Sequence, residues 1–210
     1  IFIFDNTLPI PRASLTTHLK AFITSPKNYL FTLLNSSSTT VCPMPRAWDK
    51  DDKQVQASFI KYLSKSLPTV TPQGIGSVTL GIAGQGDLDI LIPISGAVRA
   101  RCETALTKLL GAPTHQNSYM TQWKTKYQGR PVDLDLILED SPRYLEQNYL
   151  FSLLSSDPVL RREYEVVKYN SVGKNQRDYE LTRILFVDKH LISQRLQSAP
   201  PRLGQLQLIS

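Results

Sequence analysis

The chain has 210 residues, of which 41% are hydrophobic, and a formal net charge of +6. This length is sufficient to bury one good core, and no apolar run approaches the roughly 18 residues that a membrane-spanning helix needs. Its two cysteines and three scattered histidines exclude a disulfide framework and a zinc site of ordinary spacing. The composition therefore predicts one main soluble domain with a cytoplasmic location and no membrane partner.

The positive charge is unevenly distributed along the chain. Residues 46–140 contain 11 lysines and arginines against 10 aspartates and glutamates, so most of the excess lies in the two flanking segments. A polyanion could bind there. Because no run of basic residues is interleaved with aromatic residues, ordinary solvated helix faces explain the same charge.

The first 45 residues are rich in serine, threonine and proline. They are interpreted as an extension or linker with one short helix around residues 15–23. Three aspartates then precede an apolar helical pattern, which predicts a helix from Asp49 to about Ser66 that ends before Pro68. The segment 76–94, GSVTLGIAGQGDLDILIPI, predicts a strand, a loop and a second strand.

Ser95 is expected to cap the next helix, whose apolar stripe includes Cys102 and whose left-handed C-terminal cap is Gly111. Residues 119–127 and 131–138 flank the turn sequence QGR, which indicates a β-hairpin. The segments SPRYLEQNYLFSLL and DPVLRREYEVV each start with a capping residue followed by proline, and both predict helices. A longer helix is expected over residues 178–197. This order predicts an α+β fold with a small mixed β-sheet, flanking helices and a helical C-terminal part.

Two stretches of sequence place aspartates in alternation with apolar residues. Asp87 and Asp89 share one face of the expected strand, with Cα atoms about 6.5 Å apart, and VDLDL at 132–136 places Asp133 and Asp135 in the same way. Carboxylates at that distance repel each other unless a cation lies between them, and Mg²⁺ prefers oxygen ligands of this kind. If the two strands are neighbours, these acids form the cluster of a two-metal site. Solvent-facing side chains on an edge strand are the alternative.

The pair Gly76-Ser77 precedes the first acids. A glycine turn brings backbone amides and a hydroxyl close to anionic oxygens, as phosphate-binding sites require. No lysine follows with the spacing of a P-loop, so a P-loop is excluded. Lys124, Arg130 and Lys168 are candidate phosphate contacts, although each is also explained as an ordinary surface residue.

The order of these motifs resembles the nucleotidyltransferase fold of the DNA polymerase β superfamily, in which a glycine-serine pair precedes an alternating acid pair and a third acid follows on a later strand. Three segments narrow the resemblance to the GrpB-like branch over about residues 45–195: AWDKDDKQVQASFIKYL, IGSVTLGIAGQGDLDI and YLFSLLSSDPVLRREYEVVK. The chain departs from many members of that branch at Ser152 and Leu153. The expected organisation is an N-terminal extension (1–45), a GrpB-like nucleotidyltransferase domain (46–197) and a C-terminal tail (198–210).

The resemblance implies a metal-dependent transfer of a nucleoside monophosphate from an NTP to an acceptor, which would be a small molecule, a protein or RNA. Asp87 and Asp89 would be catalytic and would bind Mg²⁺ or Mn²⁺. Asp133, or Asp135 in its place, would complete a second metal ion and help to deprotonate the acceptor. The glycine-serine pair would hold the β and γ phosphates.

A second interpretation belongs to another class of protein. The chain would keep the fold without catalysis, as a binding or structural module that the N-terminal extension connects to a larger assembly. The intact set of acids opposes this interpretation, because unpaired like charges cost stability.

Overall fold

The computed structural model describes residues 42–175, 178–179, 181–183 and 185–190. Five strands form one sheet in the order β1-β2-β5-β4-β3. The β2 and β5 strands are parallel, and the other neighbouring pairs are antiparallel. This arrangement is the small mixed sheet that the sequence predicts. The strands are β1 (Gln73–Gly74), β2 (Leu88–Ile94), β3 (His115–Gln116), β4 (Met120–Tyr127) and β5 (Arg130–Leu138).

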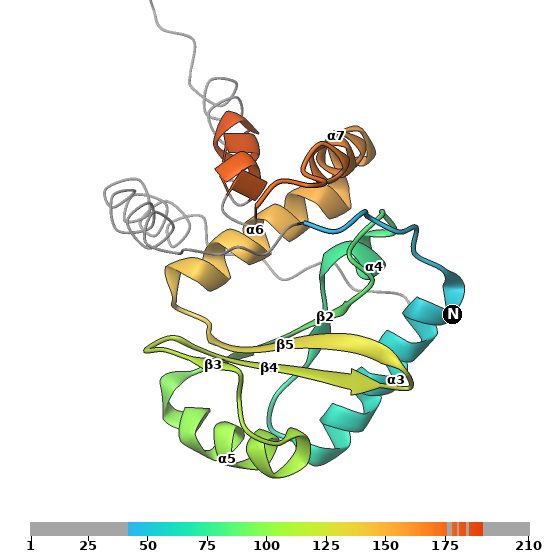
Figure 1. The fold of residues 1–210 in the computed structure, drawn as a ribbon. Coiled ribbons are helices and arrows are strands. Elements are labelled where there is room, and N and C mark those ends of the chain that lie inside the picture. The colour runs from blue at the N-terminus through green and yellow to red at the C-terminus, as the bar shows by residue number, and fades with distance from the viewer. Residues whose placement is uncertain (1–41, 176–177, 180, 184, 191–210) are drawn as a thin grey trace, which may run out of the picture.

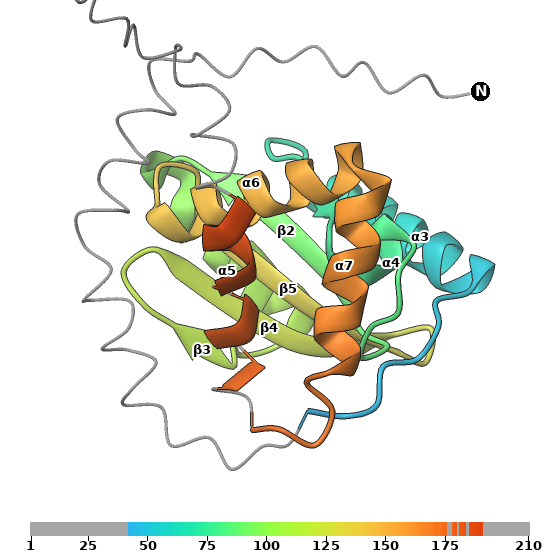
Figure 2. The ribbon, with the colours of Figure 1, turned by 90° about the horizontal axis from the view of Figure 1, so that it is seen from above.

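Helices cover both faces of this sheet (Figure 1). One face packs against α3 (Lys50–Ser66) and α5 (Arg99–Leu110), which follows the short 3-10 helix η1 (Gly96–Val98). The other side carries α4 (Gly76–Leu80), α6 (Pro142–Ser156) and α7 (Pro158–Tyr169). Seen from above, α6 and α7 lie over the strands (Figure 2). In the part of the chain that the structure describes, no helix combines the length and apolar character needed to traverse a bilayer.

The larger core lies between the sheet and the helices α3 and α5. The even-numbered apolar side chains of β2 and β5 point into it, together with Phe59 and Leu63 of α3 and Cys102 and Leu106 of α5. Leu88 and Ile90, the apolar residues that alternate with the aspartates in the sequence, are buried in this core, and Cys102 of the expected apolar stripe is buried as well. Because strand side chains alternate, the odd-numbered aspartates lie on the opposite face.

A smaller core lies on that side of the sheet, between the α4 segment and the helical C-terminal part. Its buried members come from α4 and the turn that follows it, from α6 and α7, and from residues beyond 185: Leu80, Ile82, Leu150, Leu154, Leu160, Tyr164, Phe186 and Val187. The two cores fix the sheet between two helical layers. The aspartates therefore lie between the sheet and the C-terminal helices.

Several local predictions are confirmed. The helix expected from Asp49 to about Ser66 is α3. Asp49 caps it, because its carboxylate accepts from the Asp52 amide and the Asp52 carboxylate accepts from the Asp49 amide. Ser141 and Asp157 cap α6 and α7, each directly before a proline. The strands β4 and β5 form the expected antiparallel hairpin, whose turn has positive φ at Gln128 and Gly129.

The prediction of a strand at the start of segment 76–94 is wrong, because these residues form the short helix α4 (Gly76–Leu80). Gly76 turns the chain with a φ of 72°. Gly81 ends the helix in the left-handed region, where its amide donates to the carbonyls of Ser77 and Val78. Alternation of apolar residues over one turn suits a single helical turn as well as a strand, so the pattern was too short to distinguish them.

Other differences concern helix ends and very short strands. Ser95 makes no side-chain cap, because η1 intervenes before α5, and Gly111 has a φ of 90° with an extended ψ of −170° rather than the left-handed helical cap. The two-residue strands β1 and β3 were not predicted, since they are too short to show a period. The helix expected at 15–23 lies outside the described residues. Of the helix expected over 178–197, the described residues up to His190 are helical, and the remainder lies outside.

Candidate functional site

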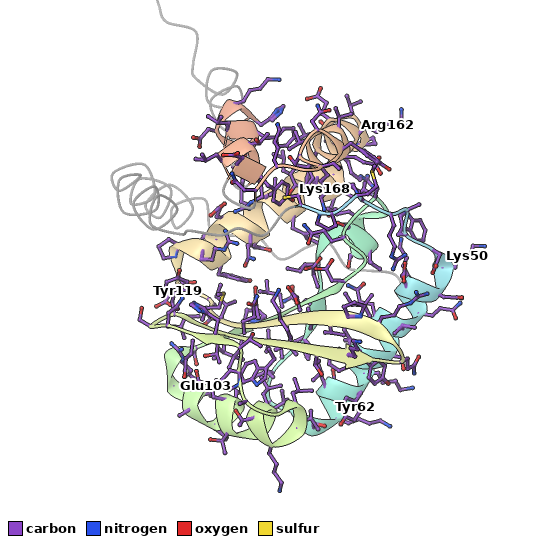
Figure 3. All side chains as sticks on the ribbon, viewed as in Figure 1. Lys50, Tyr62, Glu103, Tyr119, Arg162 and Lys168 are labelled. Carbon is purple, nitrogen blue, oxygen red and sulfur yellow. The ribbon has the colours of Figure 1, made fainter. Side chains whose placement is uncertain are left out.

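A cavity of about 280 Å³ lies between the acidic face of the sheet and the helical C-terminal part. Asp87, Asp89 and Asp133 line it on the sheet side. Lys168 reaches it from α7 (Figure 3). The cavity therefore joins an acidic floor to a largely apolar wall. That wall includes Leu80, Leu150, Phe151, Leu154, Tyr164 and Tyr179.

The parallel pairing of β2 with β5 brings the acids together. Asp89 lies directly opposite Asp133, and Asp135 lies opposite Leu91. Adjacent strands are about 4.8 Å apart, so the expectation that the two acidic strands are neighbours is confirmed. Burial raises the pKa of Asp89 well above its usual range, and the negative charge of Asp87 raises it further, while Lys168 opposes the shift.

Asp133 is held by a neighbouring cation. The Nζ atom of Lys124, which lies opposite it on β4, is 3.0 Å from Oδ2 of Asp133. The lysine side chain is 60% exposed and the aspartate side chain 24% exposed. Ion pairs with this much access to water contribute little stability, so Asp133 can exchange Lys124 for another cation at small cost.

Asp135 has different surroundings. Its Oδ1 atom accepts a hydrogen bond of 3.0 Å from Nε2 of Gln122 on β4. Burial raises the pKa of Asp135, and the bond from Gln122 opposes that rise. Asp135 is not among the residues that line the cavity. The structure thus groups Asp87, Asp89 and Asp133 and leaves Asp135 beside Gln122.

The glycine-serine pair lies against the acids. A Cβ atom added at Gly76 would be 1.8 Å from Oδ2 of Asp89, so glycine is needed for the carboxylate to occupy its position. The buried hydroxyl of Ser77 accepts a hydrogen bond from Nζ of Lys168, which also lies 5.6 Å from the ring centroid of Tyr164. A hydroxyl and a cation are therefore placed together beside the half-buried carboxylate of Asp89.

Arg130 lies away from this cavity. Its guanidinium is 3.2 Å from Oδ1 of Asp52 and 3.5 Å from Oδ2 of Asp49. Asp52 is fully buried and also receives two hydrogen bonds of 2.8 Å from Arg46. The bonds from Arg46 lower the pKa of Asp52 despite its burial. Arg130 thus takes part in a charged cluster at the start of α3.

Sequence reasoning missed cavity residues from both ends of the described chain. Tyr179 and Arg183 line the cavity from the C-terminal side, and Cys42 and Pro45 line it from the segment before α3. That segment is attached to the turn after α7, because the amide of Cys42 donates to the carbonyl of Lys174 at 2.8 Å. No local motif marks these residues, since only the packing of distant segments brings them to the cavity.

Asp87, Asp89 and Asp133 have side chains of the type that binds Mg²⁺ or Mn²⁺, and they line the same cavity. All three cavity acids offer carboxylate oxygens, the ligands that Mg²⁺ prefers, and the absence of a Cβ atom at Gly76 allows the Asp89 carboxylate to occupy its position at the cavity. They are not arranged as a finished coordination shell: among the described residues, no three histidines, cysteines or acids are grouped closely enough to hold one ion.

Comparison with known proteins identifies the fold. No protein-family model matches the chain, and no curated protein is similar to it in sequence. The crystal structure of the conserved protein GrpB from Enterococcus faecalis matches with a TM-score of 0.53 at 11% identity, over 70% of this chain and 99% of GrpB.

Two further solved structures match less well. Cid1 in complex with the UTP analogue UMPNPP gives a TM-score of 0.41 at 13% identity over 58% of this chain, which spans 40% of that protein. A cytoplasmic RNA terminal U-transferase gives 0.42 at 10% identity over 74% of this chain, which spans 43% of that protein. The match to GrpB at this low identity establishes the fold alone, and it confirms the expected GrpB-like fold.

Proposed function

We propose that the protein is a metal-dependent nucleotidyltransferase that transfers a nucleoside monophosphate from an NTP to an acceptor. The observation that carries the proposal is the parallel register that sets Asp89 beside Asp133 in a cavity shared with Asp87, Ser77 and Lys168. The acceptor would be a small molecule, a protein or RNA.

Asp87, Asp89 and Asp133 would hold Mg²⁺ or Mn²⁺, with Asp135 as the substitute for Asp133. Once bound, the metal would neutralise charge on the phosphates and lower the pKa of the acceptor hydroxyl. The raised pKa of Asp89 supports this assignment, because a half-buried carboxylate beside other carboxylates is stabilised by an added cation.

Phosphate binding and removal of the acceptor proton would be carried out by groups in or beside the cavity. Ser77 and the backbone at Gly76 would bind the β and γ phosphates, and Lys168, already hydrogen bonded to Ser77, would pair with their negative charge. A carboxylate oxygen of Asp133 would accept the proton of the acceptor hydroxyl. Lys124 would leave Asp133 for a phosphate oxygen.

Arg130 has no direct role in this proposal, because it binds Asp49 and Asp52 away from the cavity. The apolar wall formed by α6, α7 and Tyr179 would exclude water from the reacting groups.

A second candidate is a module that keeps the fold without catalysis and binds within a larger assembly. The ion pair between Lys124 and Asp133 favours it, since the acid is already neutralised inside the protein. The lack of a finished group of metal ligands in the described residues favours it as well.

Titration with each of the four NTPs in the presence of Mg²⁺ or Mn²⁺, followed by thermal shift and calorimetry, separates the two candidates. Stabilisation by a nucleotide that disappears with EDTA supports the transferase, and no stabilisation by any nucleotide supports the non-catalytic module. Asp89→Asn should weaken this binding far more than Asp140→Asn, because Asp140 is exposed and outside the cavity. Equal effects of the two substitutions would overturn the site assignment.

A further inference from the structure

One face of α7 is bonded to the segment that contains the glycine-serine pair. Nη1 of Arg161 donates to the carbonyl of Leu80 at 3.2 Å, and Oε1 of Glu165 accepts from the amide of Ala83 at 2.6 Å. Nζ of Lys168 donates to the hydroxyl of Ser77. Residues four and three positions apart lie on the same side of a helix, so Arg161, Glu165 and Lys168 form one row directed at residues 77–83.

The bond to Glu165 is the one hydrogen bond that the Ala83 amide makes within the described part of the chain. Ala83 is buried, and the two amides beside it have different partners: the Ile82 amide donates to the carbonyl of Ser77 and the Gly84 amide to that of Arg46. A buried amide without an acceptor is costly. Glu165 therefore determines where the backbone at Ala83 can lie.

Gly84, the residue after Ala83, contacts the side chain of Ser77. A Cβ atom added at Gly84 would lie 2.4 Å from Cβ and 2.5 Å from Oγ of Ser77, so the backbone of Gly84 rests directly on the serine side chain. Two backbone hydrogen bonds to Arg46, of 2.8 and 3.0 Å, hold Gly84 from the other side. Movement at Ala83 would consequently release Gly84 from Ser77 and allow the hydroxyl to turn.

We propose that Glu165 is a positioning residue, which orients the Ser77 hydroxyl toward the cavity by fixing the backbone of Ala83 and Gly84. The inference rests on the proposed function insofar as Ser77 binds phosphate. It assigns to α7 a second role besides its packing, because Lys168 and Glu165 of that helix act on the same serine from two directions.

The alternative is that Glu165 only strengthens the packing of α7. Leu160 and Tyr164 already join α7 to Leu80 and Ile82 in the smaller core. In that case the loss of Glu165 would lower the melting temperature without any specific effect on the serine, so stability alone cannot distinguish the two roles.

The test combines amide exchange with nucleotide binding. In NMR hydrogen exchange, Glu165→Ala should accelerate exchange at the Ala83 amide by at least about tenfold, relative to wild type. Glu165→Gln retains an oxygen acceptor and should restore most of the protection. The matched control is Glu163→Ala on the same helix, whose carboxylate is half exposed and lies 3.6 Å from His190. Unchanged exchange at Ala83 in Glu165→Ala would overturn the inference.

The binding arm uses magnesium with each NTP and a double-mutant cycle. Glu165→Ala should weaken binding by about fivefold, as expected for one hydrogen bond, and should cause no further loss in a Ser77→Ala background. Equal losses in both backgrounds would show that Glu165 does not act through Ser77. If the wild type binds no NTP, the proposed function fails, whereas exchange at Ala83 still decides whether Glu165 fixes this backbone.

Discussion

The contact between Gly76 and Asp89 predicts the effect of a single added methyl group. In Gly76→Ala, the new Cβ atom would lie 1.8 Å from Oδ2, 2.6 Å from Cγ and 2.9 Å from Cβ of Asp89. Real Cβ atoms do not approach other atoms so closely, so Asp89 or the turn must move. The substitution thus affects the carboxylate assigned to the metal without altering any acidic residue.

Two costs add in this variant. A residue other than glycine pays about 1–2 kcal/mol for the left-handed conformation, which Gly76 adopts with a φ of 72°. Overpacking a well-filled site costs a further ~1–3 kcal/mol. The expected loss is roughly 2–5 kcal/mol, which lowers the melting temperature of a chain of this size by roughly 4–20 °C.

Gly129→Ala provides the matched control. Gly129 has a similar φ of 77°, but an added Cβ atom there has no neighbour within 4 Å. It should therefore lose only the conformational part, about 1–2 kcal/mol. Thermal and urea denaturation measure both losses. Removal of the carboxylate in Gly76→Ala/Asp89→Ala should recover part of the difference, and equal losses in Gly76→Ala and Gly129→Ala would refute the reasoning.

Three other predictions follow from the acids. The raised pKa of Asp89 means that the folded protein retains a proton that the unfolded chain releases near its ordinary pKa of 3.8; stability should fall as pH rises from 3.8 toward the raised pKa. Asp89→Asn should lose less stability over this range in thermal denaturation with EDTA, and identical pH profiles would contradict the assignment. Asp52→Ala should cost about 3 kcal/mol in urea denaturation, because a buried carboxylate is removed from two arginines that still reach water; Asp51→Ala, which is exposed, should change stability by less than about 0.5 kcal/mol. In nucleotidyl transfer assays, Asp133→Ala should abolish activity and Asp135→Ala should reduce it only partly, because Asp133 alone of the two lines the cavity; the reverse ranking would make Asp135 the ligand.

The faces of the strands could be predicted from sequence, because alternation depends only on the local geometry of the backbone. That periodicity placed Leu88 and Leu134 in the core and put Asp89 and Asp133 on the other face. It could not show that the two strands pair in parallel. The motif order resembled a known fold in which a third acid follows on a later strand, and the structure shows that the two strands are neighbours and pair in parallel.

The details of the cavity depend on contacts that no local pattern encodes. The pairing of Lys124 with Asp133 follows from the register between β4 and β5, and the position of Arg183 follows from the packing of the C-terminal residues against α6. The short helix α4 was missed because a single turn shows no period. Such features require the tertiary structure, since each residue's neighbours come from distant parts of the chain.

The parallel pairing of β2 with β5 also has a consequence for the order of folding. The β4–β5 hairpin needs only a tight turn, whereas Asp89 and Asp133 meet after a much longer loop has closed, and such non-local contacts form slowly. Repulsion between the two carboxylates is thus absent from early folding stages and present in the native state. Neutralising Asp89 should therefore slow unfolding more than it accelerates folding, so a cation bound between these strands would extend the lifetime of the native protein chiefly by retarding its opening.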